Sequence, residues 1–383
     1  MNEQDLQDIL TTVRRFVRDE VMPAEDRIEE HDEIPEALRR QAAEMGLYGF
    51  TIPVEYGGLG LDEVEEARLV MELGYTTPAF RSLFGTNNGI AGHVLLEGAT
   101  DEQRRRYLPK LASGEWTASF ALTEPEAGSD PSTLTTAAHR AGDEWVINGS
   151  KRYITNAPTA DVFMVFARTD PDASPNKGIS AFLVERDRPG LTVGPKDHKM
   201  GQAGALTADV HFEDVRVPDA SLIGDTPGLG FATAMRCLAH GRIHIAALCV
   251  GLMQRLVDES ANWAASRHQS GHAIGEFQLV QGMLADSQTD LMAARALVLQ
   301  TARAYASGED RRTGPSCAKY FASEAVCRVA DRAVQIHGGA GYIRGVPVER
   351  LYRDARLFRL YEGTSQIQQL IIARQVLRAA KVD

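Results

Sequence analysis

The hydrophobic residues of this chain change their spacing twice. Up to about residue 116 they recur at helical spacing, as in segment 5–21 (DLQDILTTVRRFVRDEV). Between residues 117 and 226, short runs rich in Val, Ile, Phe and Thr alternate with Gly, Pro, Asp and Asn, which is typical of strands joined by turns. From residue 227 the helical spacing returns and continues almost to the C-terminus. The chain is therefore predicted to be mainly α-helical with a central β domain.

These changes of spacing predict three units. A chain of 383 residues is too long for one simple core. We expect a helical domain over residues 1–116, a small β-barrel or sandwich over 117–226 and an antiparallel helix bundle over 227–383. The sequence has no repeat of fixed period and no low-complexity linker, so the units are expected to pack tightly.

Net charge and cysteine content exclude several kinds of binding site. The net charge of -11 argues against a nucleic-acid groove or binding to an anionic membrane, because both need a basic surface. No apolar run of membrane-spanning length and no targeting peptide are recognised. The four cysteines form no CxxC pair and lie in apolar helical patterns, which predicts reduced core thiols, no metal site and a cytoplasmic protein.

Segment 120–132 (FALTEPEAGSDPS) is the first candidate for ligand binding. Thr123 and Ser129 flank a turn that contains proline and glycine, so the backbone there can approach a ligand closely and offer N–H and hydroxyl groups. A plain turn between the helical and β units explains the segment equally well. Downstream, in KRYITN (151–156), strand alternation places Tyr153 and Thr155 on the same side, although a strand with one aromatic residue is often only core.

Segment 335–345 (QIHGGAGYIRG) ends a long predicted helix with a tight glycine turn. Its amide groups could meet a phosphate, and Gln335 could bind a polar cofactor or simply belong to a helix C-cap. The segment is not a GxGxxG motif after a strand, so it does not predict a Rossmann fold.

Segment 359–366 (RLYEGTSQ) places Glu362 beside a glycine, two hydroxyls and an amide, directly before an expected helix. A glutamate at this point is favourable near the positive end of the helix dipole. The same carboxylate could instead act as a general base. Position alone allows both roles.

Five motifs taken together resemble the acyl-CoA dehydrogenase family. FALTEPEAGSD, YITN, FEDVRVP, QIHGGAGY and YEGTSQIQQLIIAR occur here in that order, and YGGLGL extends the resemblance into the first domain. The resemblance implies an N-terminal helical domain, a middle β-barrel and a C-terminal four-helix bundle. It also implies one non-covalent FAD per subunit, a homotetramer and a role in fatty acid metabolism.

The resemblance also assigns the FAD contacts. Positions that match flavin-binding residues of the family are Phe120, Leu122, Thr123, Gly128, Ser129, Tyr153, Ile154, Thr155, Thr364 and Gln366. Positions that match contacts to a neighbouring subunit's FAD are Arg267, Gln278, Gln335, Gly338 and Gly339. Two positions depart from the family pattern: Tyr153 stands where tryptophan is more usual, and Ser270 where phenylalanine is.

Glu362 matches the catalytic base of the family. Its implied role is to remove the α-proton of an acyl-CoA thioester while the β-hydride passes to flavin N5, which gives a trans-2-enoyl-CoA. The backbone N–H of Glu362 and a flavin hydroxyl would polarise the thioester carbonyl. In two branches of the family the base lies on an earlier helix, at the position of Gly241 here. A glycine cannot act as a base, which favours Glu362.

The substrate contacts implied by the resemblance are Ser129, Arg242, Gly363, Arg374 and Arg81. Ala239 replaces an aspartate that often contacts CoA. Arg81 has two interpretations. In the glutaryl-CoA dehydrogenase branch an arginine in a similar context binds a distal carboxylate, but the glutamate seven residues earlier in that branch is Gly74 here. Otherwise Arg81 is a surface or intersubunit ion-pair residue, and the substrate is a short- or medium-chain acyl-CoA.

The predicted activity is dehydrogenation of acyl-CoA, with electrons passed to an electron-transfer flavoprotein. Two alternatives stay open. A flavin oxidase or monooxygenase on the same fold would let reduced FAD meet oxygen, and Tyr153 and Ser270 leave room for it. A catalytically silent binding protein would keep the fold with a vestigial site.

Overall fold

The computed structural model describes residues 1–380, and its first part consists of helices joined by turns and loops. The helices are α1 (Glu3–Phe16), α2 (Glu25–His31), α3 (Glu36–Glu44), α4 (Glu63–Leu73), α5 (Pro78–Asn88), α6 (Ala91–Gly98) and α7 (Asp101–Ser113). Local sequence explains several boundaries. Asp62 and Glu65 form a reciprocal capping box at the start of α4, and Gly114 ends α7 in a left-handed conformation with φ 76°.

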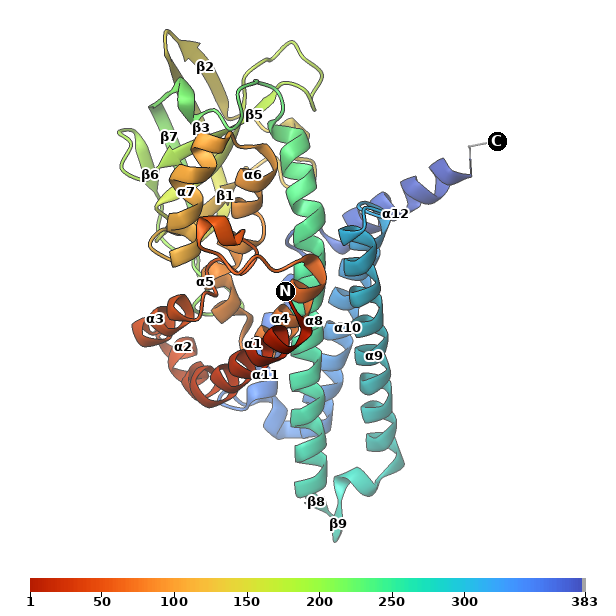
Figure 1. The fold of residues 1–383 in the computed structure, drawn as a ribbon. Coiled ribbons are helices and arrows are strands. Elements are labelled where there is room, and N and C mark those ends of the chain that lie inside the picture. Colours follow the sequence, from red (N-terminus) through yellow and green to blue (C-terminus); the bar gives the residue numbers. More distant parts are fainter. Residues whose placement is uncertain (381–383) are drawn as a thin grey trace.

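The middle part is a curled seven-stranded sheet. Its strands are β1 (Ala118–Ala121), β2 (Ala137–Ala141), β3 (Glu144–Thr155), β4 (Val162–Arg168), β5 (Ile179–Glu185), β6 (Leu191–Val193) and β7 (Thr207–Pro218). Hydrogen bonding follows the order β1-β4-β2-β3-β7-β6, with β5 on β4. The predicted β-barrel is thus present as a curled sheet at one end of the molecule (Figure 1).

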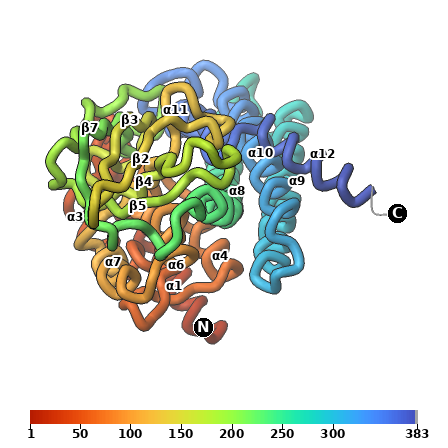
Figure 2. The backbone as a smooth tube through the Cα atoms, turned by 90° about the horizontal axis from the view of Figure 1, so that it is seen from above, coloured from red at the N-terminus to blue at the C-terminus, as the bar shows by residue number. Residues whose placement is uncertain are grey.

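The last part is the predicted helix bundle. It contains α8 (Gly230–Ser266), a small hairpin of β8 (His268–Gln269) and β9 (His272–Ala273), then α9 (Gln278–Ala306), α10 (Thr313–His337), α11 (Pro347–Ala355) and α12 (Ser365–Ala379). By length and composition alone α8 could cross a membrane, but 89% of its most apolar window is buried inside the protein. In this fold α8 is a core helix. Figures 1 and 2 show α12 leaving the body of the bundle toward the C-terminus.

Two shared cores join these parts. One hydrophobic cluster contains Phe80 and Phe84 of α5 together with Ile243 of α8 and Phe358. A second joins α6 and α7 to the sheet and to the start of α8, for example through Leu108 and Met164. Because the cores cross the domain boundaries, the three parts meet over a continuous packed junction. This junction encloses the candidate site.

Candidate active site

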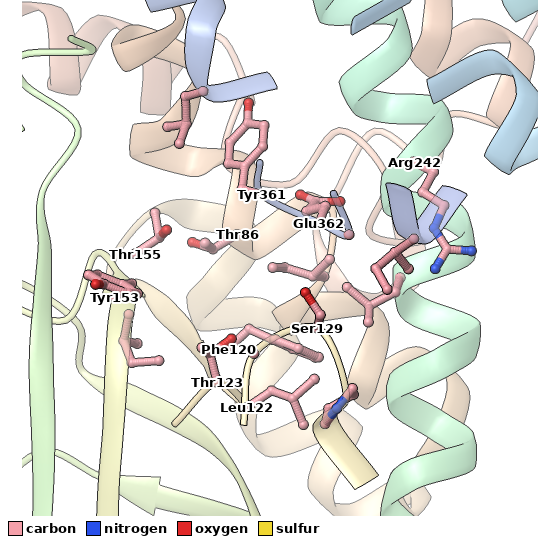
Figure 3. Close-up of a pocket in the computed structure, with 18 of the residues that line it drawn as sticks. Thr86, Phe120, Leu122, Thr123, Ser129, Tyr153, Thr155, Arg242, Tyr361 and Glu362 are labelled. Atoms are coloured by element: carbon pink, nitrogen blue, oxygen red, sulfur yellow. The ribbon is translucent and has the colours of Figure 1, made fainter. Parts of the chain in front are cut away.

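A cavity of about 610 Å³ opens where α5, β1, β3, α8 and the turn before α12 meet. Its size is within the range of small-molecule and cofactor sites. Figure 3 shows Glu362 and Tyr361 on one side of this cavity, and Phe120, Leu122 and Thr123 on the other. Tyr153 and Thr155 close a third side, and Arg242 enters from α8.

The carboxylate of Glu362 faces this cavity with one free oxygen. Oε2 has no hydrogen-bond partner among residues 1–380. The carboxylate lies over Gly241 of α8, where an added Cβ would come within 2.4 Å of Oε2. Gly241 therefore provides the space that the carboxylate occupies.

Burial raises the pKa of Glu362 above its ordinary value. Three cations lower this pKa, and their effect decreases in the order Arg81, Lys319, Arg242. The negative charge of Glu66 raises the pKa further. The side chain is thus a largely desolvated carboxylate surrounded by positive charge. Such a group can accept a proton from a bound ligand.

The backbone around the cavity is held in unusual conformations. Tyr153, Gln202 and Glu362 all line the cavity and all have positive φ, at 57°, 54° and 53°. Left-handed backbone costs a non-glycine residue about 1–3 kcal/mol, and residues that keep it cluster at functional sites. Tyr153 lies at an irregularity of the β3–β7 pairing between Lys151 and Ile154, and its side chain is 63% exposed. The predicted alternation of Tyr153 and Thr155 is interrupted there, yet both residues line the cavity.

A buried ion pair fixes the turn that follows β1. Lys151 Nζ lies 2.8 Å from Glu124 Oε1, with side-chain exposures of 0% and 3%. Lys151 Nζ also donates to the carbonyl of Leu122, and Arg152 N donates to the carbonyl of Thr123. Both contacts tie this turn to β3, so the two segments form one wall of the cavity.

Three family models match this chain in succession. They describe the N-terminal domain of acyl-CoA dehydrogenase (residues 3–115), its middle domain (119–215) and its C-terminal domain (228–377). Over 365 residues the chain is 40% identical to an acyl-CoA dehydrogenase of Bacillus subtilis and 39% identical to a 3-(aryl)acrylate reductase of Clostridium sporogenes. Each alignment covers 95% of this chain and 96% of the relative. The chain belongs to the acyl-CoA dehydrogenase family.

Solved structures agree with this assignment. Butyryl-CoA dehydrogenase from Megasphaera elsdenii matches with a TM-score of 0.94 and 32% identity, over 99% of this chain and 100% of that one. Glutaryl-CoA dehydrogenase from Mycobacterium smegmatis gives 0.91 and 31%, over 98% and 95%. A chain of the structure described as the electron transferring flavoprotein of Acidaminococcus fermentans gives 0.95 and 35%, over 99% of both. The protein is therefore an oxidoreductase of the acyl-CoA dehydrogenase family, and FAD is its cofactor.

The wall formed by the turn after β1 and the end of β3 fits a flavin. The predicted FAD residues that line the cavity are Phe120, Leu122, Thr123, Gly128, Ser129, Tyr153, Ile154 and Thr155. They combine apolar and aromatic surface with the four hydroxyl groups of Thr123, Ser129, Tyr153 and Thr155. An added Cβ at Gly128 would meet no atom within 4 Å, so the backbone there is open to a ligand. This wall could hold the flavin of the acyl-CoA dehydrogenase opposite Glu362.

Two further predicted FAD residues lie beside the cavity but do not line it. Thr364 is the N-cap of α12, and its side chain accepts a hydrogen bond from Ile367 N. Gln366 is exposed. Their predicted contacts with the flavin stay predictions. Because Thr364 is the N-cap of α12, Glu362 is not the residue that caps this helix.

The residues predicted to reach a neighbouring subunit's FAD lie at the far end of the bundle, at the bottom of Figure 1. They are Arg267, Gln278, Gln335, Gly338 and Gly339, all exposed. The stacking of Trp263 on His337, at 4.9 Å, brings the ends of α8 and α10 together there. None of these residues lines the cavity near Glu362. Ser270 lies close by, in the β8–β9 turn.

The predicted substrate residues do come together. Ser129, Gly363, Arg242, Arg374 and Arg81 all line the cavity. Arg81 is only 6% exposed, so it is not a surface residue, and no carboxylate pairs with it within residues 1–380. Its Nη2 lies 3.4 Å from the hydroxyl of Tyr361. Its Nε has no hydrogen-bond partner among residues 1–380. Ala239 does not line the cavity.

The packing of α4 against α8 also explains why residue 74 is a glycine. A Cβ there would lie 2.5 Å from the carbonyl oxygen of Leu248, so α4 and the main chain of α8 leave no space for a side chain. A glutamate at this position is incompatible with the packing of this chain.

Sequence reasoning missed Lys199, Gln202, Tyr361 and Lys319. The first three line the cavity, and Lys319 lies beneath the turn that carries Glu362. For Lys319 a signal was present, because a lysine inside an apolar stretch of a helix needs a buried partner. The other three are placed by the tertiary fold, which no local pattern reveals.

Proposed function

We propose that this protein oxidises an acyl-CoA thioester to the trans-2-enoyl-CoA, with Glu362 as the base that removes the α-proton. The observation that carries the proposal is the carboxylate of Glu362, which has a free Oε2 and faces the wall that fits the flavin. Gly241 has no side chain that would displace this carboxylate, and none that could act as the base in its place.

The surroundings of Glu362 suit this step. Its raised pKa, caused by burial, makes the carboxylate a better proton acceptor. As the proton moves to Oε2, negative charge develops on the thioester, and Arg81 and Arg242, which line the cavity, then face that charge. The N–H of Glu362 has no acceptor within the described residues and can polarise the thioester carbonyl. The wall of Phe120, Leu122, Thr123 and Thr155 would hold FAD, which would supply the two-electron oxidant for the hydride that leaves the β-carbon.

The acyl group is proposed to be short or medium in length, with a distal carboxylate as the alternative that Arg81 favours. A buried guanidinium without a counter-charge is costly, and a carboxylate can satisfy it through two parallel hydrogen bonds. Arg81 lies in the same cavity as Glu362, whose carboxylate senses its charge, but no carboxylate forms an ion pair with Arg81 within residues 1–380. A dicarboxylic acyl-CoA of the glutaryl type would supply one.

An electron-transfer flavoprotein is the proposed electron acceptor, and the functional unit is proposed to be a homo-oligomer. The exposed residues at the far end of the bundle support an oligomer. Arg267 and Gln278 can only contribute to FAD binding in another copy, because they lie far from this chain's own cavity.

The test is Glu362→Gln in the FAD-loaded enzyme. Anaerobic bleaching of the flavin by acyl-CoA should slow by about 10²- to 10⁴-fold, as expected for loss of a general base, while FAD content and acyl-CoA binding are retained. Bleaching at the normal rate would exclude Glu362 as the base. Bleaching of the wild-type flavin by any acyl-CoA would exclude the alternative of a catalytically silent binding protein. Rapid peroxide formation on aeration would instead indicate an oxidase.

A further inference from the structure

Lys319 is a fully buried lysine without a carboxylate partner. It lies on α10 with 0% exposure, and no salt bridge to it is found within the described part of the chain. Its Nζ donates one hydrogen bond of 2.8 Å, to the carbonyl oxygen of Gly363. A lysine is almost never fully buried unless it is paired, so this position requires an explanation.

The carbonyl that Lys319 binds belongs to the turn that carries Glu362. Two consecutive residues of this turn have positive φ, Glu362 at 53° and Gly363 at 88°. Gln368 supports the same turn: its Nε2 donates to the carbonyl oxygens of Gly363, at 3.0 Å, and of Glu362, at 3.2 Å. The left-handed backbone of Glu362 therefore depends on two side-chain donors, and only one of them is charged.

The charges around Glu362 come from four helices. Arg81 of α5, Lys319 of α10 and Arg242 of α8 are positive, and Glu66 of α4 is negative. Glu66 is itself held by His240 and His244, each at 2.7 Å.

Lys319 is faced in turn by Cys249 and Arg242 of α8, by Glu362, and by Glu324 on its own helix. Burial lowers the pKa of Lys319 to about 8, and Cys249, Glu362 and Glu324 act to raise it. At neutral pH its ammonium is a positive charge behind the base.

We propose that Lys319 is a positioning residue with two tasks, both performed through Glu362. Its hydrogen bond to Gly363 holds the left-handed turn, which aims the carboxylate over Gly241 and leaves the N–H of Glu362 free. Its charge keeps Glu362 ionised between turnovers, so that the base is ready to accept a proton. The inference rests on the role proposed above for Glu362.

The two tasks can be separated with three variants. Lys319→Met removes the charge and the hydrogen bond, Lys319→Gln removes the charge but keeps an amide donor, and Gln368→Leu removes the neutral donor alone. Without the ammonium the pKa of Glu362 should rise, because the remaining environment disfavours its charge. Both Lys319 variants should therefore shift the acid limb of the pH–rate profile of flavin reduction to higher pH. Gln368→Leu should slow reduction by about tenfold and leave the limb where it is.

A second readout needs no turnover. In the FAD-loaded enzyme, the infrared band of the protonated Glu362 carboxyl is identified by its absence in Glu362→Gln, and its pH midpoint is then measured. The midpoint should be higher in Lys319→Met and Lys319→Gln than in wild type, and equal to wild type in Gln368→Leu.

The proposal is overturned if either folded Lys319 variant, checked by flavin content and circular dichroism, keeps the wild-type midpoint. It is also overturned if Gln368→Leu shifts the midpoint as much as they do. Because the infrared titration involves no substrate, it gives its answer even if the protein proves inactive towards acyl-CoA. Failure of the proposed activity and failure of this inference are therefore distinguishable.

Discussion

At the scale of single residues, positions 241 and 362 exclude each other's side chains. A Cβ at Gly241 would lie 2.4 Å from Oε2 of Glu362 and 3.0 Å from Ile90. A larger residue on this turn of α8 would thus displace the carboxylate. Only one of the two positions can carry a base in this geometry, and in this chain it is residue 362.

Arg81 leads to a prediction about substrate preference. On the dicarboxylic alternative, the FAD-loaded wild type should have a higher kcat/KM for glutaryl-CoA than for pentanoyl-CoA, which has the same number of acyl carbons but no distal carboxylate. Arg81→Leu should lower kcat/KM for glutaryl-CoA about 10- to 100-fold relative to pentanoyl-CoA, the scale of a lost hydrogen bond between charged groups. Steady-state kinetics with both thioesters measures this ratio.

Arg374→Leu is the matched control for Arg81. Arg374 lines the same cavity but is exposed, so its loss should affect both thioesters alike through the CoA portion that they share. An unchanged glutaryl-to-pentanoyl ratio in Arg81→Leu would remove Arg81 from substrate selection.

At the scale of elements, the turn after β1 depends on the buried pair of Lys151 and Glu124. Glu124 also accepts hydrogen bonds from Thr135 N at 2.6 Å and Thr136 N at 2.9 Å, so one carboxylate joins the turn to β3 and to the start of β2. These contacts, above all the charge of Lys151, lower the pKa of Glu124 to about 2 against the opposing effect of burial. The flavin wall is therefore held by an ionised group inside the domain.

Removing one partner of this pair should destabilise the wall. Lys151→Met leaves the carboxylate of Glu124 buried without its cation, which typically costs about 3–5 kcal/mol. We expect a clear decrease in Tm and loss of FAD during gel filtration. Arg216→Met is the control, because the pair of Arg216 with Glu144 spans β7 and β3 but is exposed, and such pairs contribute about 0–1 kcal/mol. Equal effects of the two variants would contradict a special role for Lys151.

The order of elements could be predicted from the sequence, since hydrophobic spacing separates helices from strands. The left-handed conformation of Tyr153, the burial of Lys151 and the position of Lys319 beneath Glu362 could not. Each of them depends on contacts between segments far apart in the chain, 27 residues for Lys151 and Glu124 and 44 for Lys319 and Gly363. Family resemblance supplied roles for Glu362 and the flavin wall, but not the side chains that hold them in place.

At the scale of the whole molecule, Asp354 of α11 connects all three parts. Its carboxylate, 1% exposed, accepts hydrogen bonds from the backbone N–H of Gln202, in the loop before β7, and from the hydroxyl of Thr77, the N-cap of α5, at 3.4 Å. Gln202 lines the cavity, and its Nε2 donates a second hydrogen bond to Asp354, to the backbone carbonyl oxygen at 3.2 Å. The junction around the site is therefore linked to one buried carboxyl group.

This group predicts how stability depends on pH. Burial raises the pKa of Asp354 to about 7, although the N–H of Gln202 and the charges of Arg350 and Arg353 oppose it. In the unfolded chain an aspartate titrates near pH 3.9. Between about pH 4 and pH 7 the unfolded chain has thus lost a proton that the native protein keeps. The contribution of Asp354 to stability is complete below pH 4 and is lost as pH rises to about 7.

Asp354→Asn should remove this dependence, because an amide keeps an acceptor oxygen for Gln202 and does not ionise. We expect Tm of the FAD-loaded wild type to fall relative to that of Asp354→Asn as pH rises from 4.5 to 7.5, measured by thermal unfolding at several pH values. Asp172→Asn, in an exposed loop, controls for the change of charge alone. If the Tm difference between wild type and Asp354→Asn is the same at every pH, then Asp354 keeps an ordinary pKa in the native protein. The junction would in that case enclose an ionised carboxylate, stabilised by Arg350 and Arg353 more strongly than burial opposes it.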